Sequence, residues 1–224
     1  MSDIDVLFAK RPDLVPMFLA VISDKNNKHR PLRRWRYTIT CNDLLPDILK
    51  KLQKHYDNAT KACFNLWGDS FYIAGGSVRE AFDNSECSDI DVFSVTENPD
   101  WQSVHPDADV KKTDNGLYIQ QKTWKHPINC VTCQGGDPSD VISNFDLNCS
   151  QAAFDGKYLY CTRAFIEAII TKDLYITRWP NDQVSLLKTW ERCLKHVHYG
   201  YNLPQDLIKA LASGYKPRHI ASSF

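Results

Sequence analysis

The sequence predicts an α+β fold with a mixed, largely antiparallel sheet of about five strands and with helices before and after the sheet. Apolar residues repeat with the helical period towards both ends of the chain, whereas short β-type runs and turn residues fill its centre. Regular long helices do not separate the central strands, which disfavours a doubly wound nucleotide-binding sheet. The length of 224 residues and the 43% hydrophobic content suit one globular domain, or one domain with an appendage.

The composition narrows the class of protein. The 27 basic residues balance the 27 acidic ones, so the chain lacks the excess of Lys and Arg that histone-like and ribosomal proteins need. The N-terminus has no signal-peptide pattern, and no apolar run approaches the roughly 20 residues that span a bilayer. We therefore expect an intracellular, cytoplasmic protein whose eight cysteines are reduced.

Three segments are expected along the chain. Residues 1–66 form an N-terminal helical segment, which includes the dense basic stretch 25–36. Residues 67–161 hold the strands and form the core. Residues 162–224 return to the helical period and form a C-terminal, neck-like helical segment.

The expected elements follow from periodicity, caps and turn residues. A long helix runs through residues 44–67, with Asn42 and Asp43 as its caps. The elements after it are a strand at 70–76, a short helix at 77–84, a strand at 88–95, mostly loop at 97–116, a hairpin of 116–124 with 126–134, a short helix within 135–145, two strands within 145–161 joined by Asp155-Gly156, and helices at 162–173, 181–201 and 203–215.

The residues that carry chemistry lie around the first of these strands. Gly75 and Gly76 stand where the strand turns into a helix and let the backbone approach a ligand closely. Ser77 would lie at the helix N-terminus, where free N–H groups and the helix dipole favour an anion such as a triphosphate. Asp89 and Asp91 are two residues apart on the next strand, so their side chains share a face. Paired carboxylates of this kind suit Mg²⁺.

A two-metal site needs a third carboxylate, for which Asp146 is the best candidate. It is expected to start a later strand, with Phe145 and Leu147 pointing to the opposite face. Metal ions held in this way would activate a hydroxyl nucleophile and stabilise the pyrophosphate that leaves a nucleoside triphosphate.

These motifs resemble a known superfamily. Gly-Gly-Ser-Val-Arg-Glu, Ser-Asp-Ile-Asp-Val-Phe and Phe-Asp-Leu together resemble the DNA polymerase β-like nucleotidyltransferases, and most closely the head domain of poly(A) polymerases and CCA-adding tRNA nucleotidyltransferases. The resemblance covers roughly residues 69–160. It implies an enzyme that uses two Mg²⁺ ions, with Mn²⁺ as a substitute, to transfer NMP from an NTP such as ATP to an acceptor hydroxyl.

The resemblance also implies roles for individual residues. In the core, Gly75, Gly76 and Ser77 would hold the triphosphate, and Asp89 and Asp91 would bind both metal ions. Asp146 would deprotonate the acceptor. Arg79 would lie either near the phosphates or as a brace for the acidic loop, the segment that carries Asp89. The stretch LLKTWERCLKHVHYGYNL resembles the neck helix that binds the incoming base and sugar, with Arg192, Lys195 and Tyr199 as contacts.

The sequence also departs from the pattern. Glu80 stands where CCA-adding enzymes carry aspartate, and the segment around Asp146 lacks their preceding arginine. Only about sixty residues follow the expected sheet, too few for the long helical body that holds tRNA. A complete tRNA-maturation enzyme is therefore disfavoured.

The sequence does not decide which class of molecule accepts the nucleotide. An RNA 3′ end is favoured by the head-domain resemblance and by the basic stretch, which is either a solvated loop or a phosphate contact through Lys28, Arg30, Arg33, Arg34 and Arg36. A protein or a small molecule, as in toxin-like members, is favoured by the zero net charge and the missing RNA-binding body. A non-catalytic binding module that retains the fold is the third reading, and the presence of both glycines and all three carboxylates speaks against it.

Two patterns of metal-ligating residues are interpreted as structural. Cys130 and Cys133, with His126 nearby, form only one pair at ligand spacing, and on a strand they point to opposite faces. His196 and His198 do not share a helix face, so a solvated helix end is expected there.

Overall fold

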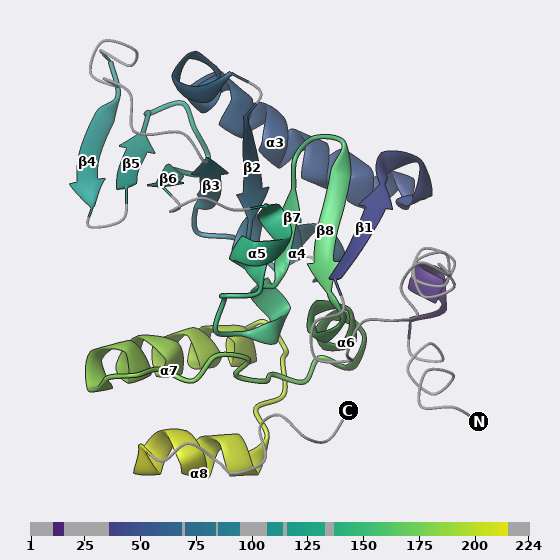
Figure 1. Ribbon diagram of the computed structural model, residues 1–224, viewed down its shortest axis with the longest axis vertical. Helices are drawn as coiled ribbons and strands as arrows, with labels where there is room; N and C mark the ends of the chain where they lie inside the picture. The colour runs from purple at the N-terminus through teal and green to yellow at the C-terminus, as the bar shows by residue number, and fades with distance from the viewer. Residues whose placement is uncertain are drawn as a thin grey trace.

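The computed structural model describes residues 11–15, 36–68, 70–83, 85–94, 107–113, 116–132 and 137–214. These residues form the expected α+β fold, with one mostly antiparallel sheet (Figure 1). The sheet has eight strands in the order β1-β8-β7-β2-β3-β6-β5-β4, so the expectation of about five was too low. The strands are β1 (Arg36–Thr40), β2 (Phe71–Ala74), β3 (Ile90–Ser94), β4 (Asp109–Thr113), β5 (Gly116–Gln120), β6 (Ile128–Thr132), β7 (Ala152–Phe154) and β8 (Tyr158–Thr162).

The helices lie before, between and after these strands. They are the α-helices α3 (Pro46–Trp67), α4 (Gly76–Asp83), α5 (Pro138–Ile142), α6 (Arg163–Thr171), α7 (Gln183–His198) and α8 (Gln205–Ser213), with short 3-10 helices η1 (Pro12–Leu14), η4 (Cys41–Asp43) and η6 (Asn148–Ser150). α3 begins at Pro46 and not at the expected caps, because proline suits the first turn of a helix and Asn42 lies in η4.

The two strands that were not expected are both edge strands. β4 pairs only with β5 and is polar and largely exposed, so no apolar alternation marks it in the sequence. β1 pairs only with β8, directly after the basic stretch. β1 does alternate, with Tyr37 and Ile39 buried and Thr38 and Thr40 exposed, but it is only five residues long.

The register of the central strands sets the geometry of the site. β2 runs antiparallel to β3 and places Ala74 opposite Asp91, whereas β3 runs parallel to β6 and places Asp91 beside Asn129. Ile90 and Val92 are fully buried in the main core, as the alternation of the motif predicts. The β5–β6 hairpin and the Asp155-Gly156 turn between β7 and β8 are also as expected.

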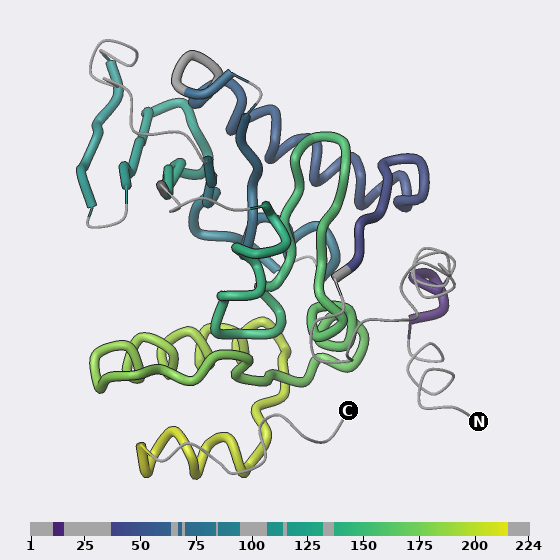
Figure 2. Tube along the Cα trace, in the orientation of Figure 1, coloured from purple at the N-terminus to yellow at the C-terminus, as the bar shows by residue number. Residues whose placement is uncertain are grey.

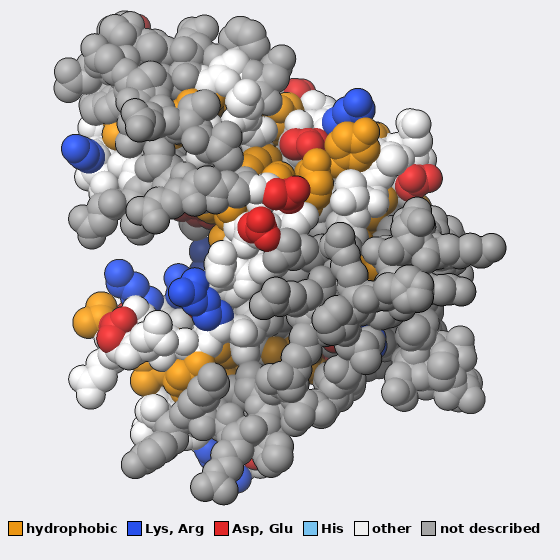
Figure 3. Space-filling model, in the orientation of Figure 1, with side chains coloured by type: hydrophobic (Ala, Val, Ile, Leu, Met, Phe, Trp, Pro, Cys, Tyr) orange, Lys and Arg blue, Asp and Glu red, His pale blue; other side chains and the backbone are white. Residues whose placement is uncertain are grey.

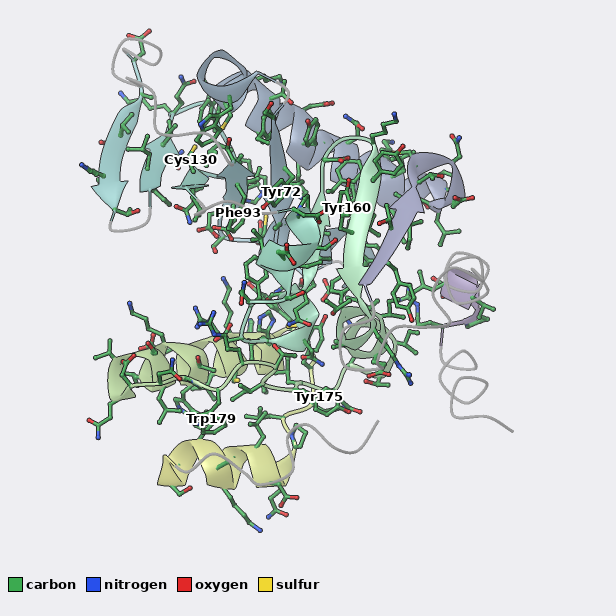
Figure 4. The ribbon with its side chains drawn as sticks, viewed as in Figure 1. Tyr72, Phe93, Cys130, Tyr160, Tyr175 and Trp179 are labelled. Atoms are coloured by element: carbon green, nitrogen blue, oxygen red, sulfur yellow. The ribbon has the colours of Figure 1, made fainter. Side chains whose placement is uncertain are left out.

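Helices cover both faces of the sheet. α3 and α4 pack on β2 and β3, and α5 packs on β7 and β8 (Figure 1). Tyr72, Phe93 and Tyr160 gather near α5 in a second apolar cluster, apart from Cys130, which belongs to the main core (Figure 4).

A third layer lies beyond one end of the strands. The chain leaves β8 through α6 and continues into α7 and α8, which run side by side below the sheet (Figure 2). A core of its own, which includes Leu147, Cys193 and Leu207, holds this layer together, and Trp179 packs against it. No described helix is long and apolar enough to cross a membrane.

Candidate nucleotide and metal site

The turn between β2 and α4 brings backbone close to the expected metal ligands. Gly75 has a φ of +71°, a left-handed conformation that side-chain-bearing residues rarely adopt. A Cβ on Gly75 would lie 3.5 Å from Asp91 Oδ2, so the glycine and this carboxylate are direct neighbours. Gly76 begins α4, and the first amides of a helix have no acceptor within it. Free N–H groups and a carboxylate therefore lie side by side at this end of the sheet.

Ser77 contributes its backbone rather than its hydroxyl. The side chain is fully buried, and its Oγ donates to the carbonyl of Ala74 at 3.2 Å. The hydroxyl thus closes the β2–α4 turn from inside, so the Ser77 side chain is not available to a ligand.

Asp91 is a largely buried carboxylate without a full countercharge. Its Oδ1 accepts a 2.7 Å hydrogen bond from the neutral amide of Asn129. Burial, and after it the negative charge of Asp89, raise the pKa of Asp91 to about 6, against the opposing effects of Asn129 and Lys195. A divalent cation would offset both effects, so the pair of aspartates fits a hard oxygen-ligated metal.

Asp89 lies half-buried just before β3 and links the acidic loop to α7. Its Oδ1 accepts a 2.7 Å hydrogen bond from Ser88 Oγ, and Lys195 Nζ donates to the same Ser88 oxygen at 3.1 Å. The positive end of Lys195 therefore reaches across from α7 to the loop that carries the aspartates.

Asp146 does not start a strand, contrary to the expectation. It lies in a bend before η6, and β7 begins only at Ala152. The physical reason is that Leu147 pairs with Ile176 through one isolated β-bridge, so no ladder of strand hydrogen bonds continues through this segment.

The contacts of Asp146 are with α7 and not with the other two aspartates. Its Oδ2 accepts a 2.7 Å hydrogen bond from Thr189 and forms an ion pair with Arg192. The oxygens of Asp89, Asp91 and Asp146 do not all lie within 4.8 Å of one another, although all three residues are described. In this arrangement Asp146 fastens α7 to the core, and its role as a third metal ligand stays a prediction.

Arg79 is a buried brace. Its Nε donates to Ser85 Oγ at 3.0 Å and lies 3.4 Å from Asp83 Oδ2, and its Nη1 lies 3.0 Å from His196 Nδ1. Its guanidinium also stacks 5.1 Å from the ring centre of Tyr199. Of the two roles implied by resemblance, the contacts match the one in which this arginine supports the loop before Asp89.

His196 is buried, so the expectation of a solvated helix end was wrong for this residue. Only 4% of it is exposed, and burial together with the charge of Arg79 lowers the pKa of His196 to about 3. The imidazole is therefore neutral and accepts a hydrogen bond from Arg79, an interaction that appears only when α7 is docked on α4. His198 is exposed, as expected.

One face of α7 is basic and turns towards the acidic loop. Lys188, Arg192 and Lys195 follow a spacing of four and three residues, and all three are exposed. Figure 3 shows a notch between the sheet and α7 with Lys and Arg side chains on the α7 side. Tyr199, at the end of α7, is engaged by Arg79.

Asn129 and Thr189 are site residues that the sequence analysis did not single out. Asn129 is a polar residue inside an apolar run, which is the one sequence signal it offers. Its pairing with Asp91 depends on the parallel β3–β6 register, which no local pattern encodes. The basic residues Lys28, Arg30, Arg33 and Arg34 lie outside the described residues, as does the side chain of Arg36.

The fold is similar to that of CCA-adding enzymes of known structure. The Thermotoga maritima CCA-adding enzyme complexed with tRNA has the same fold, with a TM-score of 0.51 at 13% identity over 79% of this chain and 45% of that one. A CCA-adding enzyme with CTP gives 0.49 at 15% identity over 77% and 43%, and a tRNA-processing enzyme gives 0.47 at 17% over 76% and 47%. This chain therefore spans less than half the length of these proteins.

Residues 40–172 match the Gabija anti-defense 2 family, and the chain belongs to this family. The matched region runs from the end of β1 to the end of α6 and includes Gly75, Asp89, Asp91 and Asp146. It excludes α7 and the basic face on it. No curated protein matches this chain.

Proposed function

We propose that this protein is a metal-dependent nucleotidyltransferase whose Mg²⁺ is held by Asp89 and Asp91. The observation that carries the proposal is Asp91, a largely buried carboxylate beside a second carboxylate and a glycine turn. Burial of such a charge costs free energy unless a cation compensates it. Bound there, Mg²⁺ or Mn²⁺ would neutralise the triphosphate and polarise the α-phosphate; a second ion is part of the proposal.

The triphosphate would lie on the N-terminus of α4, with Gly75, Gly76 and Ser77 supplying backbone rather than side chains. Across the notch, Arg192 and Lys195 on α7 would contact the nucleotide, with Lys188 extending the same basic face. Tyr199 would act through Arg79, since the two are stacked.

In the reaction, the acceptor oxygen forms a bond to the α-phosphorus, the bond to the bridging oxygen breaks and pyrophosphate leaves. The acceptor proton goes to a base, for which Asp146 is our proposal. Asp146 would first exchange its contacts with Thr189 and Arg192, so a nucleotide that draws Arg192 to its phosphates would free this carboxylate.

Two acceptors are supported by different observations. The fold shared with a tRNA-bound CCA-adding enzyme supports an RNA 3′ end. The family description, an anti-defense protein directed at Gabija, supports an acceptor in that defense system, which makes a protein the second candidate.

Acceptor identification tests both candidates together. Purified protein would be incubated with Mg²⁺ and each α-labelled NTP, and with total RNA, lysate protein or purified Gabija components. Label that enters RNA or protein, and that disappears in Asp89→Asn and Asp91→Asn, is the expected result. Label that persists in both variants would refute the site.

An outcome without label in any arm, and without an NTP-dependent rise in melting temperature, would favour the non-catalytic binding module.

A role for the basic stretch has its own test. Neutralising Arg33, Arg34 and Arg36 should reduce transfer to RNA and flatten its salt dependence, while transfer to protein stays unchanged.

A further inference from the structure

Four side chains of types that can ligate a metal, and that nucleotidyl transfer does not use, come together at the loop before β3. They are His55, Glu80, Cys87 and His126. His55 Nε2 lies 3.5 Å from Glu80 Oε2, and Cys87 Sγ lies 3.9 Å from His126 Nδ1. Ligand atoms of the first three all lie within 4.8 Å of one another, the one such group of His, Cys, Asp or Glu among the described residues.

The four side chains come from four separate segments and are shielded from water. His55 is in the middle of α3, Glu80 is on α4, Cys87 is in the loop before β3, and His126 precedes β6. Exposure is 5% for His55, 4% for Cys87 and 8% for His126, and 20% for the Glu80 side chain. Residues that far apart in sequence meet here in a buried, polar point of the fold.

Protein groups satisfy this point only in part: Glu80 Oε2 accepts the amide of Cys87 at 2.9 Å and pairs with His55 Nε2, which leaves the other ring nitrogen of His55. His55 Nδ1 is buried and has no hydrogen-bond partner. The ring of His126 lies 5.8 Å from that of His55, edge to face, so the two imidazoles do not bond to each other. Buried polar atoms without partners are rare and call for an explanation, such as an ion.

We propose that His55, Glu80, Cys87 and His126 bind one Zn²⁺ ion. Two imidazoles, one thiolate and one carboxylate are ligands that zinc takes in tetrahedral sites, at about 2.0–2.3 Å. Ligand atoms at such distances lie roughly 3.3–3.8 Å apart by tetrahedral geometry. The His55–Glu80 and Cys87–His126 separations of 3.5 and 3.9 Å are close to this range, whereas His126 lies outside the group of three and would move towards the ion on binding. Mg²⁺ does not suit this set, because it prefers oxygen ligands.

The site would position the acidic loop rather than take part in chemistry. Cys87 is two residues before Asp89, and a Cβ on Gly76 would lie 3.8 Å from the Cβ of Cys87. The residue after His126, Pro127, accepts the amide of Ile90 at 2.9 Å. A zinc ion would thus join α3, α4, the acidic loop and the entry to β6, and so fix the spacing between the glycine turn and the aspartates.

This site does not contain the pair of Cys130 and Cys133, which has the spacing of zinc ligands in the sequence. Cys130 is fully buried in the main core, with its sulfur 3.6 Å from that of Cys63. Cys133 lies outside the described residues. His126 therefore joins Cys87, which the spacing of cysteines in the sequence does not indicate.

A cobalt titration of the full-length protein, stripped of metal, tests the proposal. Co²⁺ in this site should give an intense thiolate-to-metal charge-transfer band that saturates at one equivalent and is displaced by Zn²⁺. The aspartate site offers only oxygen ligands and gives no such band. In Cys87→Ser the band should vanish, and zinc binding should weaken by more than the ~10–100-fold that loss of an outer-shell partner causes. Cys149→Ser, which removes an equally buried thiol elsewhere, should keep the band.

X-ray absorption of the zinc-loaded wild-type protein needs no variant and settles the case if Cys87→Ser fails to fold. One sulfur at about 2.3 Å with nitrogen or oxygen ligands at about 2.0–2.2 Å is expected. Absence of a sulfur ligand, a cobalt band retained in folded Cys87→Ser, or no stoichiometric metal in the wild type would overturn the proposal. None of these readouts depends on nucleotidyl transfer, so the two proposals can fail separately.

Discussion

Asp83, with a fully buried side chain, and Asp91, with a largely buried one, have opposite surroundings. Asp83 lies 3.4 Å from Arg79 and 3.3 Å from Lys172, and accepts a 2.7 Å hydrogen bond from Tyr201. Burial raises its pKa, but the cations and hydrogen bonds outweigh burial and leave the pKa of Asp83 lowered. For Asp91, burial and a neighbouring negative charge leave the pKa raised, at about 6.

Under the proposed function, the difference separates a structural charge from a metal-binding one. The protein supplies its own cations to Asp83, which joins α4 to the segments that lead into and out of α7. It supplies a neutral amide to Asp91, for which no ion pair is found among the described residues.

The largest effect is expected from Asp91→Asn. The amide keeps the shape but cannot hold the metal, so we expect transfer to fall by at least about 10³-fold, or ~4 kcal/mol of transition-state stabilisation. The metal-free variant should unfold at the same or higher urea concentration than the wild type, because a destabilising buried charge is removed. A loss of stability that parallels the loss of transfer would place Asp91 among the structural charges.

Arg79→Met should have the opposite signature. It removes one cation from Asp83 and the hydrogen-bond donor to His196, and breaking a buried ion pair costs ~3–5 kcal/mol. Urea unfolding measures this loss. Lys111→Met is the control, since its pair with Asp109 is exposed and should be worth less than ~1 kcal/mol. Equal effects of the two substitutions would contradict the contrast.

The pH dependence of stability should differ in sign for the two aspartates. The pKa of Asp91 is about 6 when folded against an ordinary 3.8, so the folded state holds its proton more tightly. The stabilising contribution of protonated Asp91 to the free energy of unfolding is present below about pH 4. This contribution declines by ~2 kcal/mol as the pH rises to about 6. Asp83 contributes stability that is complete above pH 3.8 and is lost as the pH falls through its lowered pKa.

Unfolding of the metal-free wild type and of Asp91→Asn across pH 4–7 isolates the Asp91 part. The difference in unfolding free energy should change with pH in the stated direction, and Mg²⁺ binding should be about tenfold weaker at pH 5 than at pH 7. A difference that does not vary with pH would show that Asp91 has an ordinary pKa.

A smaller effect is expected from Gly75→Ala. The left-handed φ of +71° costs about 1 kcal/mol for a residue with a Cβ, and the new methyl group would touch Asp91 Oδ2. Gly68→Ala is the matched control, with a φ of +59° and no atom within 4 Å of its Cβ. Both should lose similar stability, whereas only Gly75→Ala should also weaken Mg²⁺ and NTP binding. Equal NTP binding in the two variants would separate the glycine turn from the site.

Much of the fold was predictable because local patterns encode it. Helical periodicity marks α3, α6, α7 and α8, and Asp155-Gly156 marks the β7–β8 turn, where Gly156 has a φ of +89°. The edge strand β4 was missed because it is polar and exposed, and β1 was missed although Tyr37 and Ile39 alternate with threonines, because it is only five residues long. The glycine turn and the two aspartates are contiguous motifs, and so they too could be predicted.

Site residues that depend on distant contacts could not be predicted. Asn129 meets Asp91 through a parallel register, and His196 is buried only because α7 docks on Arg79. Asp146 was predicted as a strand residue from its apolar neighbours, whereas tertiary contacts hold it in a bend against α7. In each case the pattern was read over a few residues, and the contact spans more than thirty in sequence.

The central claim is that Asp91 is left without a countercharge so that a metal–nucleotide complex can supply one. Calorimetric titration of NTP into the metal-free wild type and Asp91→Asn, each with Mg²⁺ and with EDTA, tests it most directly. We predict that the wild type binds NTP with Mg²⁺ and at least about tenfold more weakly in EDTA, and that Asp91→Asn loses this dependence on Mg²⁺. Equal NTP affinity with Mg²⁺ and with EDTA in the wild type, or an undiminished Mg²⁺ effect in Asp91→Asn, would contradict the account.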